Sequence, residues 1–188
     1  MGSNLSVSEI QGLTSGGNAN TISIASGHKI TGAAGSIVTP GQVIQVQHAS
    51  FTSQISTTSG TQAATGIAMN FTPHRANSKL LVRFNIQGVY NNTTNSGWNL
   101  YVYRDGSGVT ESGLHTASGH EGRFIYAAAH STGGEILEFS CEVFLSANNT
   151  NQTNIALWGG LYGSGTSYIN VNAASGDRSF MTIEEVAQ

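Results

Sequence analysis

The residues best suited to acid–base chemistry are Glu138 and Glu142, four positions apart in a segment of alternating apolar and polar residues. Such alternation predicts a β-strand, on which the two carboxylates would share a face about 13 to 14 Å apart. Carboxyl groups that hydrolyse a glycoside are only roughly 5 to 9.5 Å apart. We therefore interpret this pair as a solvated face, although Glu111, Glu121 or Glu135 could approach either residue from another strand. The sequence also lacks a phosphate-binding loop, a nucleophile elbow and a zinc-helix motif, so we predict no catalytic residues and no enzyme.

Six histidines raise the question of a metal site, because imidazole is a common metal ligand. His115 and His120 are five positions apart beside Glu121, and the other histidines are scattered along the chain: His28, His48, His74 and His130. This spacing is not typical of a metal motif, so we expect neither a metal nor a cofactor within one chain. If three copies pack around an axis, one inward histidine from each would supply three ligands, and His28 and His48 are the candidates.

Aromatic and amide side chains are the remaining candidates, because amphipathic rings stack on sugars while amides bind their hydroxyl groups. The possible contacts with a glycan or another subunit are Asn91, Asn92, Trp98, Tyr101, Tyr103 and Trp158. Tryptophans such as Trp98 and Trp158 more often pack under a sheet than bind glycan. Tyr101 and Tyr103 alternate with Leu100 and Val102, so one of these two faces is exposed or lies at an interface.

The composition limits the function classes. Charged residues make up 9% of the 188 positions, against roughly 25% in an average soluble protein. Seven Lys and Arg against ten Asp and Glu give a net charge of −3, so there is no basic surface to collect phosphates and nucleic-acid binding is disfavoured. No apolar run is long enough to cross a membrane, we find no secretory signal, and the single Cys141 cannot form an intrachain disulfide.

Period-two alternation runs through much of the chain, and no convincing stretch repeats at 3.6 residues. The clearest strands are 135–146, with Leu137 to Leu145 alternating with glutamate and serine, then 80–87 and 67–72. Weaker candidates are 42–55, 97–104, 122–131, 154–162, 167–172 and 179–186. Turn signals separate them, and Asp105-Gly106 is interpreted as a hairpin turn rather than a calcium loop. About nine strands without crossover helices predict an all-β fold, an antiparallel β-sandwich of jelly-roll type.

The first 41 residues differ from the rest, because isolated apolar residues are separated by Gly- and Ser-rich stretches. These side chains are too few to close a core of their own. We predict that residues 1–41 form an extended N-terminal arm for attachment and trimer association, ahead of a jelly-roll head at 42–188. The expected arm contacts are Ile22, Ile24, Ile30, Ile37 and Val38.

Several segments carry a resemblance to a known group of proteins: 30–47, 67–73, 77–82, 100–106 with Tyr103-Arg104-Asp105-Gly106, and 178–187 with Met181-Thr182-Ile183-Glu184-Glu185. Together they resemble a module of tail-fibre and other virion proteins of tailed phages, especially marine and cyanobacterial ones. The resemblance covers most of the chain from about residue 20 onward. It implies a homotrimer of jelly-roll heads whose N-terminal segment docks onto neighbouring chains in the particle. It implies no particular ligand-binding residue.

Two functions follow from the resemblance and the composition. The first is a head on a short tail fibre or baseplate, where Asn-rich loops such as 91–95 and 148–151 would meet a host-surface glycan. The second is a capsid decoration, or cement, protein that stabilises the head shell. Both place the protein in the virion, assembled in the bacterial cytoplasm, with other copies and either tail, baseplate or major capsid proteins as partners. Neither involves nucleic acid or membrane insertion.

Overall fold

The computed structural model describes residue 26, residues 38–111, residue 114, residues 122–125 and residues 136–188. The chain divides into two units, Met1–Ile37 and Val38–Gln188, and the fold below is that of the second unit. The expected arm contacts Ile22, Ile24, Ile30 and Ile37 lie outside the described residues, so the arm and its boundary at residue 41 stay predictions. No helix in the described part of the chain is long and apolar enough to span a membrane.

Strands and one 3-10 turn are the regular elements of the described residues. Their bounds are β1 (Val43–Phe51), β2 (Ile55–Thr57), β3 (Ala63–Phe71), β4 (Lys79–Asn91), β5 (Gly97–Arg104), β6 (Ser107–Gly108), β7 (Arg123–Ile125), β8 (Leu137–Ser146), β9 (Thr153–Tyr162), β10 (Ser167–Ile169), η1 (Ala173–Ser175) and β11 (Ser179–Val186).

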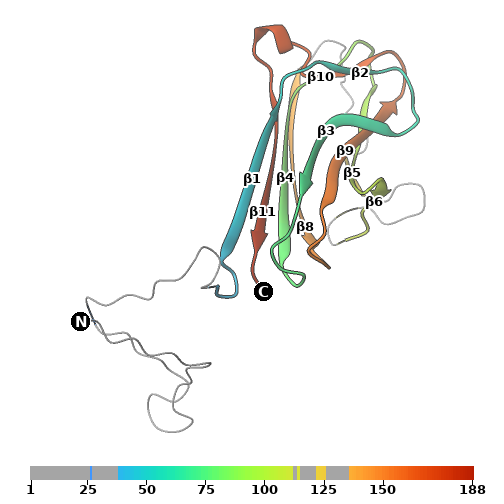
Figure 1. The fold of residues 1–188 in the computed structure, drawn as a ribbon. Coiled ribbons are helices and arrows are strands. Elements are labelled where there is room, and N and C mark those ends of the chain that lie inside the picture. Colours follow the sequence, from blue (N-terminus) through green and yellow to red (C-terminus); the bar gives the residue numbers. More distant parts are fainter. Residues whose placement is uncertain (1–25, 27–37, 112–113, 115–121, 126–135) are drawn as a thin grey trace. The chain divides into compact units, whose positions relative to one another are not determined.

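The strands form two antiparallel sheets. The first has the order β1-β11-β4-β10-β2, with β8 also paired to β4, and the second has the order β3-β9-β5-β6, with β7 also paired to β5. Figure 1 shows β1, β11, β4 and β8 in one layer and β3, β9 and β5 in the other.

The pairing is nested along the chain. The first long strand pairs with the last, β3 pairs with β9, β4 pairs with β8, and β5 pairs with β7. This is the path of a long hairpin rolled into two sheets, which is the jelly-roll arrangement. The predicted all-β jelly-roll sandwich is confirmed.

The strongest sequence patterns produce the central strands. On β4 the alternate residues Leu80, Val82, Phe84 and Ile86 are fully buried between the sheets. Val143 and Leu145 on β8 join the same core, which also takes side chains from β3, β5, β9, β10 and β11. On β4 and β8 period-two alternation therefore identified the inner face correctly, because most side chains of the opposite face are exposed or half-buried.

One of the weaker strand predictions needs correction, and another is tested only in part. The segment predicted as one strand, 42–55, is interrupted after Phe51, because β1 pairs with β11 whereas β2 pairs with β10. The side-chain amide of Asn170 donates to the carbonyls of Phe51 (3.0 Å) and Ser53 (3.1 Å) and so satisfies the backbone where the strand stops. Of the strand predicted at 122–131, residues 126–131 lie outside the described residues.

The Asp105-Gly106 turn is confirmed. Both residues have positive φ, 50° and 80°, as a type I′ hairpin turn requires. The turn returns the chain as the short strand β6, which the sequence pattern did not predict, and pairs Arg104 with Ser107. The Asp105 carboxylate accepts hydrogen bonds from the Thr153 hydroxyl (2.8 Å) and the Asn154 backbone N–H (2.7 Å), and so it braces this turn against β9.

Candidate binding surface

The outer face of the first sheet is the candidate binding surface. Residues that are paired across antiparallel strands lie on the same face, so the register defines rows of side chains. One row runs from His48 through Thr182 and Arg83 to Glu142, and the next runs from Ser50 through Phe180 and Asn85 to Ser140. Three strands that are far apart in the sequence, β1, β11 and β4, thus place their outward side chains side by side.

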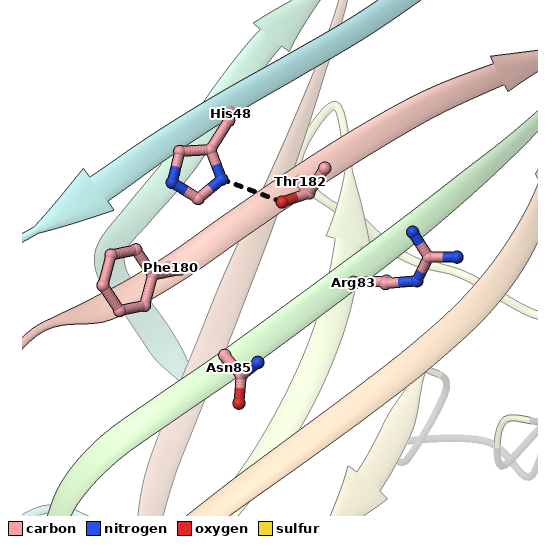
Figure 2. A pocket seen from close by; sticks show the side chains of 5 residues that line it. All are labelled: His48, Arg83, Asn85, Phe180 and Thr182. Atoms are coloured by element: carbon pink, nitrogen blue, oxygen red, sulfur yellow. Dashed lines mark hydrogen bonds between the residues drawn. The ribbon is translucent and has the colours of Figure 1, made fainter. Parts of the chain in front are cut away.

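A pocket of about 350 Å³ lies across these two rows. It is lined by His48, Arg83, Asn85, Phe180 and Thr182 (Figure 2). His48 Nδ1 is 2.9 Å from the Thr182 hydroxyl oxygen, with which it shares a hydrogen bond. The imidazole also stacks on the Phe180 ring, with centroids 5.5 Å apart and an angle of 24° between the planes. These two contacts fix the orientation of an exposed histidine.

Arg83 is held by carboxylates on both neighbouring strands. Its Nε donates to Glu142 on β8 at 2.6 Å, and its Nη1 donates to Glu184 on β11. The hydrogen bond to Glu142, followed by that to Glu184, raises the pKa of the guanidinium. With all three groups ionised the charge of this cluster is +1 − 1 − 1 = −1, so the arginine does not present a free positive charge to the pocket.

The rows next to the pocket, toward the C-terminal end of β11, carry exposed apolar side chains. Val43, Val46 and Phe144 keep 45%, 57% and 49% of their surface exposed. The register places Val46 and Phe144 in one row with Glu184 and Leu81, and Val43 in the row beyond. We call these three residues the apolar end. It lies where the backbone of Gly41 and Gln42 pairs with Ala187, close to the C-terminus.

Three of the residues predicted to contact a glycan are buried within the chain, and the prediction is corrected for them. Trp98 and Tyr101 are each only 2% exposed, and Asn91 is fully buried. The Trp98 indole N–H donates to the Tyr168 carbonyl (2.9 Å), while the Asn91 amide donates to the Ser167 hydroxyl (2.6 Å). Trp98 faces the core because it alternates in phase with Leu100 and Val102.

Tyr103 and Trp158 lie together on the outer face of the second sheet. Their rings are stacked with centroids 4.3 Å apart and planes inclined by only 5°. The Tyr103 hydroxyl hydrogen-bonds to Gln62 Oε1 at 2.5 Å. Asn92 is exposed in the loop after β4, where its Oδ1 accepts from the Thr166 N–H at 2.8 Å and so shapes the loop. The fold does not bring these three residues to the pocket on the first sheet, and their role as contacts stays a prediction.

Most carboxylates of the described segments hold the fold. Glu185 accepts from the backbone N–H groups of His74 and Arg75, and Glu111 accepts from the backbone N–H of Ser146. Glu111 therefore lies at the end of β8 beside Arg104, with which it forms an ion pair at 3.4 Å. Within the described segments no three His, Cys, Asp or Glu side chains are placed to hold a metal ion.

The pocket residues other than His48 were not predicted as a site. Their outward orientation follows from the alternation on β4 and β11. Their proximity does not, because it depends on β11 lying between β1 and β4 and on the register of both pairings. Of the two histidines considered for a shared metal, His48 is exposed on the edge strand β1, whereas His28 lies outside the described residues.

Comparison with known proteins gives a distant likeness only. No protein-family model matches the chain, and no curated protein is detectably similar to it in sequence. Among solved structures the chain is similar to the infectious bursal disease virus VP2 subviral particle (13% identity, TM-score 0.40), to T=1 particles derived from that virus (13%, 0.42) and to its Gt strain (14%, 0.42). Each alignment covers 86% of this chain and 42%, 41% and 43% of the respective viral chains, so this chain spans less than half the length of the chains it matches.

Proposed function

We propose that this protein is a structural component of a tailed-phage virion, displayed on the particle exterior as a homotrimer. Its jelly-roll unit serves as the head of a short tail fibre or baseplate protein that binds the host surface. The observation that carries this proposal is the outer face of the first sheet, where an apolar end and an open pocket lie on one rigid surface. The apolar end suits contact with a second copy, and the pocket suits contact with the host.

The use of the carboxylates supports a structural role. Asp105, Glu111, Glu142, Glu184 and Glu185 each accept hydrogen bonds that hold a turn, a loop or neighbouring strands. A general acid or base needs a carboxyl group that is free to exchange a proton with a substrate. Carboxylates that are engaged in this way stabilise a scaffold.

The charge of the outer face supports contact between identical copies. Five charged side chains project from this face, and their formal charges sum to +1 + 1 − 1 − 1 − 1 = −1: Lys79, Arg83, Glu138, Glu142 and Glu184. Four of them are satisfied within one chain, because Lys79 Nζ donates to the Ser146 hydroxyl at 2.7 Å and Arg83 pairs with Glu142 and Glu184. The fifth, Glu138, is exposed on β8 six residues from Phe144. A second copy can therefore cover Val43, Val46 and Phe144 without burying an unpaired ion beside them.

Residues 1–41 complete the proposal as an arm that docks onto a neighbouring chain or another virion protein. Its widely spaced apolar residues, such as Ile22, Ile24 and Ile30, would each fill a small recess on the surface to which the arm binds. Deleting residues 1–41 should leave a folded head that no longer joins the particle. Normal incorporation of the truncated protein would contradict the role of the arm.

Replacing Phe144 by aspartate tests the contact between copies. Light scattering of the wild type should give a mass near three times 19.6 kDa. Phe144→Asp should shift the mass toward one chain, because it would place a charge in an apolar contact. Ser140→Asp is the matched control, since it adds the same charge on the same face of β8, two rows from Phe144. A wild type that stays monomeric, or a Phe144→Asp variant that stays trimeric, would refute this contact.

The position on the particle separates the attachment head from a capsid decoration protein. Density of the protein at the tail or baseplate, together with loss of host adsorption in particles that lack it, is the expected result. Density on the shell, with normal adsorption but reduced resistance to heat or osmotic shock, would establish the decoration role instead.

A further inference from the structure

The pocket beside the apolar end has the chemistry of a saccharide site. We propose that the pocket formed by His48, Phe180, Thr182 and Asn85 binds a neutral saccharide. This inference names the ligand class for the attachment function proposed above, and it rests on that function. Its volume of about 350 Å³ lies in the lower part of the roughly 300 to 1,000 Å³ that small-molecule sites occupy.

The Phe180 ring supplies the apolar wall. Sugars present C–H groups on one face and hydroxyls at their edges, so a binding site combines an aromatic ring with polar groups around it. The stacked His48 ring holds Phe180 from one side, and Figure 2 shows Asn85 on the other side of Phe180, projecting from β4. Because both rings and the amide stand on strands of one sheet, the site needs no rearrangement to form.

Polar groups that are not engaged by the described chain surround this wall. The Asn85 amide, which offers both a donor and an acceptor, makes no hydrogen bond to another described residue. The contact with Thr182 engages His48 Nδ1 and leaves Nε2 on the far side of the ring (Figure 2). The exposed hydroxyls of Ser50 and Ser140 end the same row of side chains. This set can exchange hydrogen bonds with several sugar hydroxyls.

The charge next to the pocket selects against acidic ligands. Arg83 lines the pocket, but Glu142 and Glu184 bind its guanidinium, and the cluster has a net charge of −1. Lys79 is four residues from Arg83 along β4, roughly 13 Å away. A phosphate, a sialic acid or a uronic acid would therefore meet a net negative charge, whereas a neutral sugar would not.

Saturation-transfer NMR on the full-length protein tests the proposal with methyl glycosides of glucose, galactose and N-acetylglucosamine, and with N-acetylneuraminic acid as the acidic comparator. At least one neutral glycoside should bind more tightly than the acidic sugar. Phe180→Ala should weaken that binding about fivefold through loss of the aromatic wall, and Asn85→Ala should weaken it independently. Ile136→Ala is the control, since Ile136 is an apolar side chain, 50% exposed, that neither lines the pocket nor belongs to the apolar end.

Glu142→Gln provides a second variant that retains the pocket wall. It changes the cluster charge from −1 to +1 − 1 = 0, so the acidic sugar should bind about two- to threefold more tightly while the neutral glycoside is unaffected. Circular dichroism of each variant establishes that the sheet is intact.

Three results would overturn the proposal: binding by none of the neutral glycosides, equal binding by wild type and Phe180→Ala, or tighter wild-type binding of the acidic sugar. Saccharide binding by the Phe144→Asp protein but not by the wild-type trimer would show that a second copy fills the pocket, which also overturns it. These outcomes are distinct from failure of the proposed virion function, which is read from light scattering and from the position on the particle.

Discussion

The Cys141 thiol is shielded by its position on β8. Burial, with a smaller contribution from the charge of Glu142, raises its pKa from an ordinary value of 9.0 to about 11. The thiolate is the nucleophile, so at pH 8 the difference of 11 − 9.0 = 2 lowers the reactive fraction about a hundredfold relative to the unfolded chain. We predict correspondingly slow alkylation of the native protein by iodoacetamide and fast alkylation in urea. Equal rates in the two states would contradict the shielding.

The same pKa shift has a consequence for stability. Between pH 9 and about pH 11 the unfolded chain releases the Cys141 proton while the native chain retains it. The unfolded state then binds fewer protons, so the free energy of unfolding falls as the pH rises through this window. A Cys141→Ser variant should lose this part of the pH dependence.

Glu185 and its neighbour Glu184 show how the face of a strand determines the role of a carboxylate. Glu185 is fully buried and accepts from the N–H groups of His74 and Arg75 and from the Ser78 hydroxyl, at 2.8, 2.9 and 2.6 Å. Glu185→Ala should lower the free energy of unfolding by about 3 kcal/mol, because it leaves buried donors unpaired. Glu184→Ala removes only an ion pair on the outer face and should cost less than about 1 kcal/mol. Urea denaturation measures both losses. Equal losses of unfolding free energy in the two variants would contradict this reasoning.

At the scale of elements, Gly88 is the position at which β4 changes partners. The register with β8 shifts between Ile86 and Val89, and the Gly88 carbonyl accepts from the Val171 N–H at 3.0 Å. Gly88 has φ +59°, and a Cβ there would lie 2.2 Å from Asp177 Oδ2 and 2.8 Å from the Val171 nitrogen. The segment after β10 can therefore approach β4 closely only because Gly88 has no side chain.

We predict that Gly88→Ala lowers the free energy of unfolding by about 3 kcal/mol, since left-handed strain and a backbone clash add together. Gly66 on β3 is the matched control. It also has positive φ, +86°, but a Cβ there would meet nothing within 4 Å. Gly66→Ala should cost only the strain of about 1 to 2 kcal/mol. Similar losses measured for the two variants by urea denaturation would refute the steric argument.

The elements also show how far the sequence pattern could lead. Strands with one buried face, such as β4 and β8, were predicted because alternation records burial. The short strands β2 and β6 carry too few residues for a period to emerge, and β6 exists because Asp105 and Gly106 form the turn before it. Tyr101 was overestimated as a ligand contact, whereas Trp98 packs in the core as the sequence favoured. Aromatic residues fill a core as readily as they line a binding site.

At the scale of the whole molecule, the nested pairing of the jelly roll explains why the binding surface escaped prediction. Alternation shows which side chains point outward but not which strands are neighbours. β1 and β11 are separated by most of the chain, yet His48 lies directly opposite Thr182. The pocket residues meet because of the register of β11 with β1 and with β4. Register between strands that are distant in the sequence is determined by packing of the complete core.

The low charge of the chain leads to a prediction about the proposed homotrimer. Arg83 pairs with Glu142 and Glu184, and Arg104 pairs with Glu111, so these ions already have partners on their own chain. Contact through Val43, Val46 and Phe144 would instead depend on apolar burial, which salt screening does not weaken. At one fixed protein concentration, the mass measured by light scattering should therefore be the same in about 0.05 M and in about 1 M NaCl. Ammonium sulfate strengthens apolar burial, so in its presence the trimer should persist to lower protein concentrations before it dissociates. Dissociation in 1 M NaCl would mean that charged groups hold the copies together, and the apolar end would then be excluded as the main contact.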